Sequence, residues 1–151
     1  MIVRRAVVDD CPVIAEFNRC MARETEEKEL DRQGSDLGVK NLFTRPDLGF
    51  YQVAELDGRV VGSLMITFEW SDWRNGLFWW VQSVYVRPEY RQRGVFRAMY
   101  EDIRRQAQEN QVVCGIRLYV FKGNTGAIVS YNRLGMSETE YSMMEEEFRT
   151  S

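Results

Sequence analysis

Residues 89–100 read EYRQRGVFRAMY and place Arg91, Arg93 and Arg97 around a single glycine, Gly94. The stretch follows an apolar run and leads into a helical pattern, so the glycine falls at an expected helix start. The first amides of a helix lack internal partners, successive turn amides can form an anion nest, and a glycine lets a ligand approach the backbone. Arginines add forked hydrogen-bond donors. The chemistry that this stretch favours is binding of a phosphate or pyrophosphate.

A plainer interpretation of the same stretch stays open, namely an arginine-rich, solvated helix start. In that case Arg97 and Arg105 would flank Glu101 on the surface, and charge alone cannot decide between the two. The chain as a whole carries 20 Lys and Arg residues against 23 Asp and Glu residues, a net charge of −3. A general nucleic-acid binder needs a broad basic face, so we expect no nucleic-acid partner.

Acid–base chemistry in this chain must proceed without histidine, because the sequence contains none. A Ser-His-Asp triad, a Cys-His pair and a His-ligated metal are therefore excluded. Cys11, Cys20 and Cys114 are odd in number and form no CxxC pair, so we expect neither a disulfide framework nor a metal site. Carboxylates, tyrosines, lysines and the backbone remain as the groups that can move protons.

The length of 151 residues suits one domain spanning residues 1–151. No apolar run is long enough to span a bilayer, so we expect no membrane partner. The first residues, MIVRRAVVDD, lack the apolar segment of a signal peptide, and a cytoplasmic location is the default expectation.

The elements that must position the arginines alternate between strand and helix patterns. We expect strands at residues 2–8, 50–56, 59–70, 77–88, 112–121 and 141–148, and helices at residues 9–24, 37–45, 94–110 and 124–135. Asp57-Gly58 between two apolar runs predicts a β-hairpin with a primed turn. This order of elements predicts an α/β fold with a mixed sheet and helices on its faces.

Two motifs in this order resemble those of the GNAT superfamily of N-acetyltransferases. The first is a V-x-V-x-P strand followed by Arg/Gln-x-x-Gly-x-Gly/Ala at a helix start, and the chain has VYVRP, Arg91 and Gly94, with Phe96 where a small residue is usual. The second is N-x-x-A-x-x-x-Y followed by L-G-M, which appears as Asn124, Ala127, Tyr131, Leu134, Gly135 and Met136. The resemblance covers nearly the whole chain.

The resemblance implies a central mixed sheet of about six or seven strands, with helices on both faces and acetyl-coenzyme A as cosubstrate between the splayed fourth and fifth strands. It also implies which residues bind that cosubstrate. The backbone of Val84, Tyr85 and Val86 would bind the pantetheine arm, and Asn124 would hydrogen-bond the cofactor beyond the loop. The pyrophosphate would lie on Arg91 and on the amides of Gln92, Arg93, Gly94, Val95, Phe96 and Arg97. Val84 and Val86 as plain core residues, and Asn124 as a helix cap, are the alternatives.

The reaction that the resemblance implies is direct attack of an amine on the thioester, in a ternary complex without an acyl-enzyme. Tyr131 would donate a proton to the departing thiolate, since a tyrosine stays protonated at neutral pH; a packing role is the alternative. Some relatives use a glutamate on the fourth strand as base, but this strand carries Gln82, which cannot accept a proton. That feature favours the second function we consider, a non-catalytic acyl-coenzyme A binding or sensing module.

Three glutamates, Glu69, Glu24 and Glu27, are candidates for the general base, and each of them can equally be a surface carboxylate. The acidic run ETEEKELD, together with Glu69, predicts a cationic or amine-rich acceptor, either a small molecule or a peptide. Alternation along a strand sends Trp79 and Trp80 to opposite faces. The tryptophan cluster, completed by Trp70 and Trp73, fits a rigid hairpin, a homodimer contact or a substrate wall.

Overall fold

The computed structural model describes residues 1–149 of the chain, which divide into two compact units. The first unit, Met1–Leu118, contains one sheet and three α-helices, and the second begins at Tyr119 and contains one helix. The strands are β1 (Ile2–Arg5), β2 (Gly49–Leu56), β3 (Arg59–Ser71), β4 (Gly76–Val86) and β5 (Val113–Arg117); the α-helices are α1 (Cys11–Glu26), α2 (Arg32–Phe43), α3 (Val95–Glu109) and α4 (Thr125–Arg133). No helix within the described residues is both long enough and apolar enough to span a bilayer.

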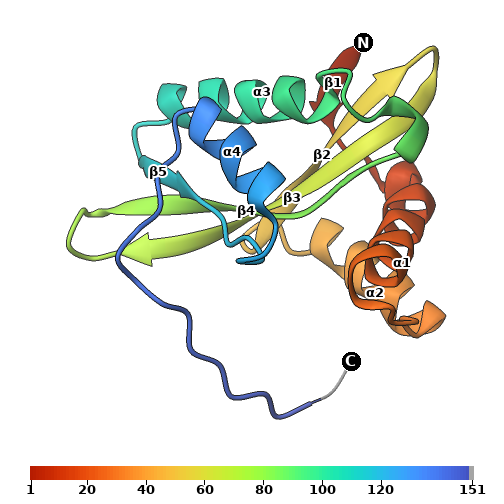
Figure 1. The fold of residues 1–151 in the computed structure, drawn as a ribbon, viewed down its shortest axis with the longest axis horizontal. Coiled ribbons are helices and arrows are strands. Elements are labelled where there is room, and N and C mark those ends of the chain that lie inside the picture. Colours follow the sequence, from red (N-terminus) through yellow and green to blue (C-terminus); the bar gives the residue numbers. More distant parts are fainter. Residues whose placement is uncertain (150–151) are drawn as a thin grey trace. The chain divides into compact units, whose positions relative to one another are not determined.

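The sheet of the first unit is mixed and has five strands in the order β1-β2-β3-β4-β5. The first four pair antiparallel, and β5 pairs parallel to β4. Helices α1 and α2 cover one face of this sheet and α3 covers the other (Figure 1). The expected α/β class, with a mixed sheet and helices on both faces, is confirmed, whereas the expected count of six or seven strands is too high.

The hairpin between β2 and β3 turns where the sequence predicts it. Asp57 and Gly58 have φ angles of 52° and 74°, the two left-handed residues that a type I′ turn requires. This turn type matches the twist of the strands, so β2 and β3 stay paired from Gly49↔Thr67 to Leu56↔Arg59.

Helix α3 packs against the sheet through one apolar stripe. Val95, Met99, Ile103 and Ala107 are all buried, at the spacing of three or four residues that places side chains on one helix face. The N-terminal part of α3 approaches β3 at Gly62. A Cβ atom there would lie 3.1 Å from Val95 Cγ1 and 3.2 Å from Met99 Cε, so the glycine sets the close approach of helix and strand.

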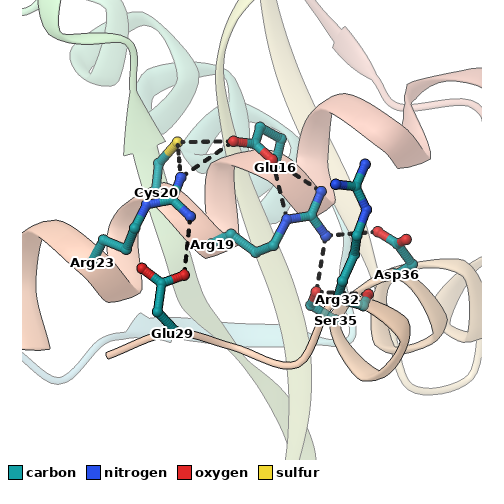
Figure 2. A network of polar contacts seen from close by, with 8 residues as sticks. All are labelled: Glu16, Arg19, Cys20, Arg23, Glu29, Arg32, Ser35 and Asp36. Atoms are coloured by element: carbon teal, nitrogen blue, oxygen red, sulfur yellow. Dashed lines mark hydrogen bonds and ion pairs between the residues drawn. The ribbon is translucent and has the colours of Figure 1, made fainter. Parts of the chain in front are cut away.

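Helices α1 and α2 are joined by a buried arginine. Arg19 is 7% exposed, and its guanidinium contacts Glu16 Oε2 at 3.0 Å, Asp36 Oδ1 at 2.8 Å and Ser35 Oγ at 2.9 Å (Figure 2). The buried charge is thus paired with two carboxylates that are themselves 49% exposed, which offsets the cost of desolvating the guanidinium. The contacts fix α2 beside α1.

The start of α2 differs from the prediction, because the helix begins at Arg32 and not at residue 37. Asp31 caps it by accepting a hydrogen bond from the amide of Gly34 at 2.7 Å. The polar residues before position 37 predict a break between helices, yet the cap and the Arg19 contacts stabilise a helix there.

The C-terminal residues also differ from the prediction. β5 ends at Arg117, four residues earlier than expected, and residues 141–148 form no strand in the part of the chain described here. The apolar side chains of that segment are exposed, with Met144 at 93% and Phe148 at 89%. The strand expected at residues 141–148 is therefore wrong, and this accounts for the lower strand count.

Candidate functional site

The C-terminal half of β4 extends beyond its parallel neighbour. Pairing with β5 runs from Leu77↔Val113 to Trp80↔Arg117 and stops there, while β4 continues to Val86. On its other side β4 stays paired with β3 as far as Gly62↔Val86. Residues 81–86 therefore have one edge beyond the reach of the β4–β5 ladder, because β5 ends at Arg117.

A β-bulge interrupts β4 within this extension. Met65 faces Gln82 and Ser63 faces Tyr85, so Leu64 alone lies opposite both Ser83 and Val84. Ser83 has a φ of 51°, in the left-handed region that few residues other than glycine adopt. A bulge leaves its extra residue out of the ladder and bends the strand. Backbone groups at this point are thus released from pairing.

The loop after β4 combines two left-handed residues with a helix N-terminus. Gln92 and Gly94 have φ angles of 61° and 79°, and the first α-helical bond of α3 runs from the amide of Ala98 to the carbonyl of Gly94. Within residues 1–149, the amides of Gln92, Arg93 and Gly94 donate to no protein acceptor. A Cβ on Gly94 would meet open space. The loop presents backbone donors at the positive end of α3, the arrangement that binds anions.

Arg91 connects this loop to β4 and to α1, and its role at the pyrophosphate stays a prediction. Its Nε donates to the carbonyl of Val86 at 2.8 Å, and its Nη2 contacts Glu24 Oε1 on α1 at 2.7 Å. The hydroxyl of Tyr85 donates to the other oxygen of Glu24. Both contacts lower the pKa of Glu24, and burial together with the Glu24 charge raises the pKa of Tyr85. Glu24 is therefore held ionised as the link between α1 and the loop.

The other residues of the arginine-rich stretch have varied surroundings. The guanidinium of Arg93 lies 5.6 Å from the centre of the Tyr90 ring, and that of Arg97 pairs with Glu101 at 2.9 Å. Phe96 packs against Tyr100 and the α3 core, with 6.0 Å between ring centres. Its ring therefore lies on the helix, so it does not fill the space above Gly94.

The side chains of residues 84–86 belong to the core. Val84 and Val86 pack against the α3 cluster, and the Tyr85 ring contacts Phe17 of α1 in a tilted arrangement with 5.1 Å between ring centres. The core role considered for the two valines thus applies to their side chains. It leaves open the predicted role of their backbone, because the edge of β4 is unpaired with β5 at this point.

Two of the carboxylate candidates for the general base, Glu24 and Glu27, lie at the end of α1, and the third, Glu69, lies on β3. Glu69 accepts from Arg117 at 2.7 Å, and Glu27 is an exposed left-handed residue at the end of α1. Gln82 uses its Nε2 to donate to Thr67 Oγ1 across the β3–β4 pair. No group of three or more metal-ligating side chains occurs in residues 1–149.

The four tryptophans differ in exposure, and strand alternation predicted different surroundings for two of them, Trp79 and Trp80. Trp79 is buried at 6% exposure in the α3 core and Trp80 is half-buried, while Trp70 and Trp73 are 58% and 86% exposed. The four tryptophans therefore do not line a single surface, because their surroundings differ widely.

The second unit holds the remaining predicted site residues. Asn124 caps α4, with its Oδ1 accepting from the amide of Ala127 at 3.1 Å. Tyr131 is half-buried on α4, and burial raises the pKa of its hydroxyl. Tyr131 is therefore protonated at neutral pH, as a general acid must be.

Sequence analysis missed two features of the site. The role of Glu24 as the partner of Tyr85 and Arg91 joins residues more than sixty positions apart, so no local pattern shows it. The bulge at Ser83 did leave a signal. Apolar side chains facing α3 occur at 79 and 81 and then at 84 and 86, which is a shift of one residue in the alternation.

Comparisons with known proteins agree with this geometry. The sequence profile of the acetyltransferase (GNAT) family matches residues 12–136. A solved structure described as a possible acetyltransferase from Clostridium difficile 630 is 43% identical, with a TM-score of 0.92 over 99% of this chain and 98% of that one. No curated protein sequence matches.

Two more distant structures share the fold. Glucosamine-6-phosphate N-acetyltransferase from Arabidopsis thaliana is 17% identical, with a TM-score of 0.73 over 98% of each chain. Ribosomal-protein-alanine N-acetyltransferase from Brucella melitensis biovar Abortus 2308 is 15% identical, with a TM-score of 0.78 over 98% of this chain and 99% of that one. The family profile and the 43% identical structure, together with the edge of β4 beyond β5 and the loop at Gly94, place the chain in the GNAT acetyltransferase family.

Proposed function

We propose that the protein transfers an acetyl group from acetyl-coenzyme A to a primary amine, by direct attack in a ternary complex. The observation that carries this proposal is that the β4 bulge and the β4 edge beyond β5 are followed, at the start of α3, by the amides of Gln92, Arg93 and Gly94, which donate to no acceptor within residues 1–149. Membership of the acetyltransferase family supports the same reaction type.

The residues present suit acetyl-coenzyme A in two ways. The free edge of β4 at Val84, Tyr85 and Val86 offers the alternating donors and acceptors of an open strand, which suit the amides of a pantetheine arm. The amides from Gln92 to Arg97, at the start of α3, suit a pyrophosphate. Asn124 uses its Oδ1 as a helix cap, so its amide nitrogen is the group that we assign to the cofactor.

The acetyl-transfer chemistry assigned to this chain needs one donor and one acceptor of protons. A free alkylamine has a pKa of about 10.4, so the acceptor amine must lose a proton before or during attack. Glu24 is a poor base, because Tyr85 and Arg91 lower the pKa of its carboxyl. We therefore assign the proton transfer to water. Backbone released at the Ser83 bulge would stabilise the oxyanion, and Tyr131 would protonate the thiolate.

The acceptor that we propose is cationic or rich in amines. Glu26, Glu27 and Glu29 at the end of α1 are exposed, and Glu24 is ionised. A surface of this kind attracts positively charged molecules and raises their local concentration.

The test is release of the coenzyme A thiol with a panel of cationic, neutral and anionic amines. Turnover with cationic amines is expected. Binding of acetyl-coenzyme A without turnover of any amine would favour the acyl-coenzyme A binding or sensing module instead. Tyr131→Phe should then lower the single-turnover rate about a hundredfold to ten-thousandfold with little change in cofactor affinity. Wild-type chemistry in a folded Tyr131→Phe protein would reduce Tyr131 to a packing residue.

A further inference from the structure

The end of α3 remote from Gly94 borders a second concave site. A cavity of about 720 Å³ opens there, with an aromatic side formed by Phe50, Phe68 and Trp79. Its polar side is formed by Arg5, Gln106, Glu109, Asn110 and Gln111, and Pro46, Gly49 and Val112 complete the lining. All of these residues lie in the first unit, on β1, β2, β3, β4, α3 and the adjoining loops.

The aromatic side of the cavity is one packed cluster of three rings. Phe50 meets Trp79 edge to face, with 5.3 Å between ring centres, and both rings lie 6.2 Å from Phe68. The rings come from three adjacent strands, so the sheet holds them in place. Trp79 is buried, whereas Phe50 and Phe68 are only partly buried and keep surface that a ligand can cover. Such a cluster favours a flat apolar ligand.

Arg5 supplies positive charge at this cavity. Its guanidinium lies 3.5 Å above the centre of the Phe50 ring and donates to Gln106 Oε1 at 3.1 Å. Within residues 1–149 Arg5 forms no ion pair, in contrast to its neighbour Arg4, which pairs with Asp10 and Glu55. Desolvation lowers the pKa of Arg5, and the charge of Asp102 opposes this shift only in part.

The acidic groups near Arg5 are already engaged. Asp102 accepts from Gln52, Gln106 and Arg105, and Glu109 pairs with Arg105 at 3.3 Å. Four of the five guanidinium N–H groups of Arg5 remain for a ligand, because only one bond to protein is made. A carboxylate is the group that a planar guanidinium fork matches best.

We propose that this cavity binds a small aromatic carboxylate, with its ring on Phe50, Phe68 and Trp79 and its carboxylate on Arg5. The site is separate from the proposed coenzyme A site. The fifteen residues of α3 span about 22 Å at a rise of about 1.5 Å per residue, and the two sites adjoin opposite ends of that helix. The inference does not depend on the acetyl transfer proposed above.

The test uses 2-naphthoate and its neutral analogue 2-naphthalenemethanol, with affinity measured by calorimetry and ligand-observed NMR. Arg5→Met keeps an unbranched side chain on Phe50 and removes the charge. It should weaken naphthoate binding about tenfold to a hundredfold, the range for loss of a charge-assisted hydrogen bond, and leave the alcohol unaffected. Arg74→Met is the matched control, since Arg74 also lies over a phenylalanine ring, 5.0 Å from Phe78, but outside the cavity.

Several results would overturn the proposal. They are no binding of naphthoate at millimolar concentration, equal affinity for the alcohol, or the same loss in Arg74→Met as in Arg5→Met. Thermal unfolding and coenzyme A binding check that each variant is folded. If Arg5→Met does not fold, Arg5→Lys takes its place: it keeps the charge but not the fork, so wild-type naphthoate affinity in that variant would also overturn the assignment. Retained coenzyme A binding alongside any of these failures leaves the proposed acetyl transfer intact.

Discussion

The two ends of helix α3 border two sites of different construction. At its N-terminus the groups assigned to a ligand are mostly backbone atoms from one continuous stretch, residues 84–97. At its C-terminus they are side chains that converge from four strands and the helix. A site built from consecutive backbone atoms leaves a sequence motif, because glycine and strand patterns control the backbone directly. A site built from converging side chains leaves no such motif.

The largest effect is expected from a charge placed in the N-terminal site. Gly94→Glu should weaken coenzyme A binding roughly a hundredfold, through repulsion and loss of amide contacts each worth about 1.5–3 kcal/mol. Gly94→Gln is the matched control, because it imposes the same strain at φ 79° without the charge. Calorimetry measures both. Equal coenzyme A affinities for the two variants would contradict the assignment of the pyrophosphate to this loop. A loss of naphthoate affinity in Gly94→Glu would mean that the sites at the two ends of α3 are coupled.

A smaller effect is expected where α3 approaches the sheet. Gly62→Ala should destabilise the fold by about 1–3 kcal/mol, since the new methyl group meets Val95, Met99 and the carbonyl of Tyr85 at 3.1–3.2 Å. Gly38→Ala adds the same group where nothing lies within 4 Å, and it should stabilise α2 by about 0.5–1 kcal/mol. Thermal and urea unfolding measure the stability changes of both variants. Equal stability changes would show that Gly62 does not control the approach of α3.

The Glu24 link is expected to contribute about 1 kcal/mol or less, because solvent screens a carboxylate that is 38% exposed. Its pKa is below the usual 4.5, owing to Tyr85 and Arg91, so the stabilisation is present above pH 4.5 and is lost as the pH falls through the lower folded value. The difference in free energy of unfolding between wild type and Glu24→Gln should be constant near pH 7 and should disappear at acidic pH. A difference that persists at low pH would mean that the ionised form is not what stabilises the loop.

The smallest effect is expected at the other end of α3. Arg5→Met should change the free energy of unfolding by no more than about 0.5 kcal/mol, since Arg5 is exposed, its hydrogen-bond partner is uncharged, and methionine keeps a side chain on the Phe50 ring. Urea unfolding at neutral pH is the measurement. A loss of several kcal/mol would identify Arg5 as a structural residue and would explain its position over Phe50 without any ligand.

Local signals in the sequence predicted most of the first unit. Asp57-Gly58 specified its turn because only a left-handed pair closes such a hairpin, and the α3 stripe specified its own buried face. The glycine loop was predicted in the same way, although the left-handed Gln92 beside Gly94 was not.

The failures have physical causes as well. α2 depends on Asp31 as cap and on Arg19 from α1, a tertiary contact that outweighs the low helix propensity of its glycines. Charge near a glycine does not indicate where the Arg91 side chain points, and in the structure it contacts the Val86 carbonyl and Glu24. Its predicted role at the pyrophosphate stays a prediction. Whether Asn124 and Tyr131 act on the cofactor remains a prediction.

The β4 bulge has a consequence for engineering. Ser83 is the residue inserted at the bulge. The side chains of residues 81, 84 and 86 face α3, while Tyr85 faces α1. Removing the one position between 82 and 84 preserves all four orientations. A Ser83 deletion would give a straight, regularly paired strand with the same core. Such a shortened protein would keep its packing but would lose the bend and the released backbone on which, in our proposal, acetyl transfer depends. The requirements of folding and of catalysis could then be measured separately.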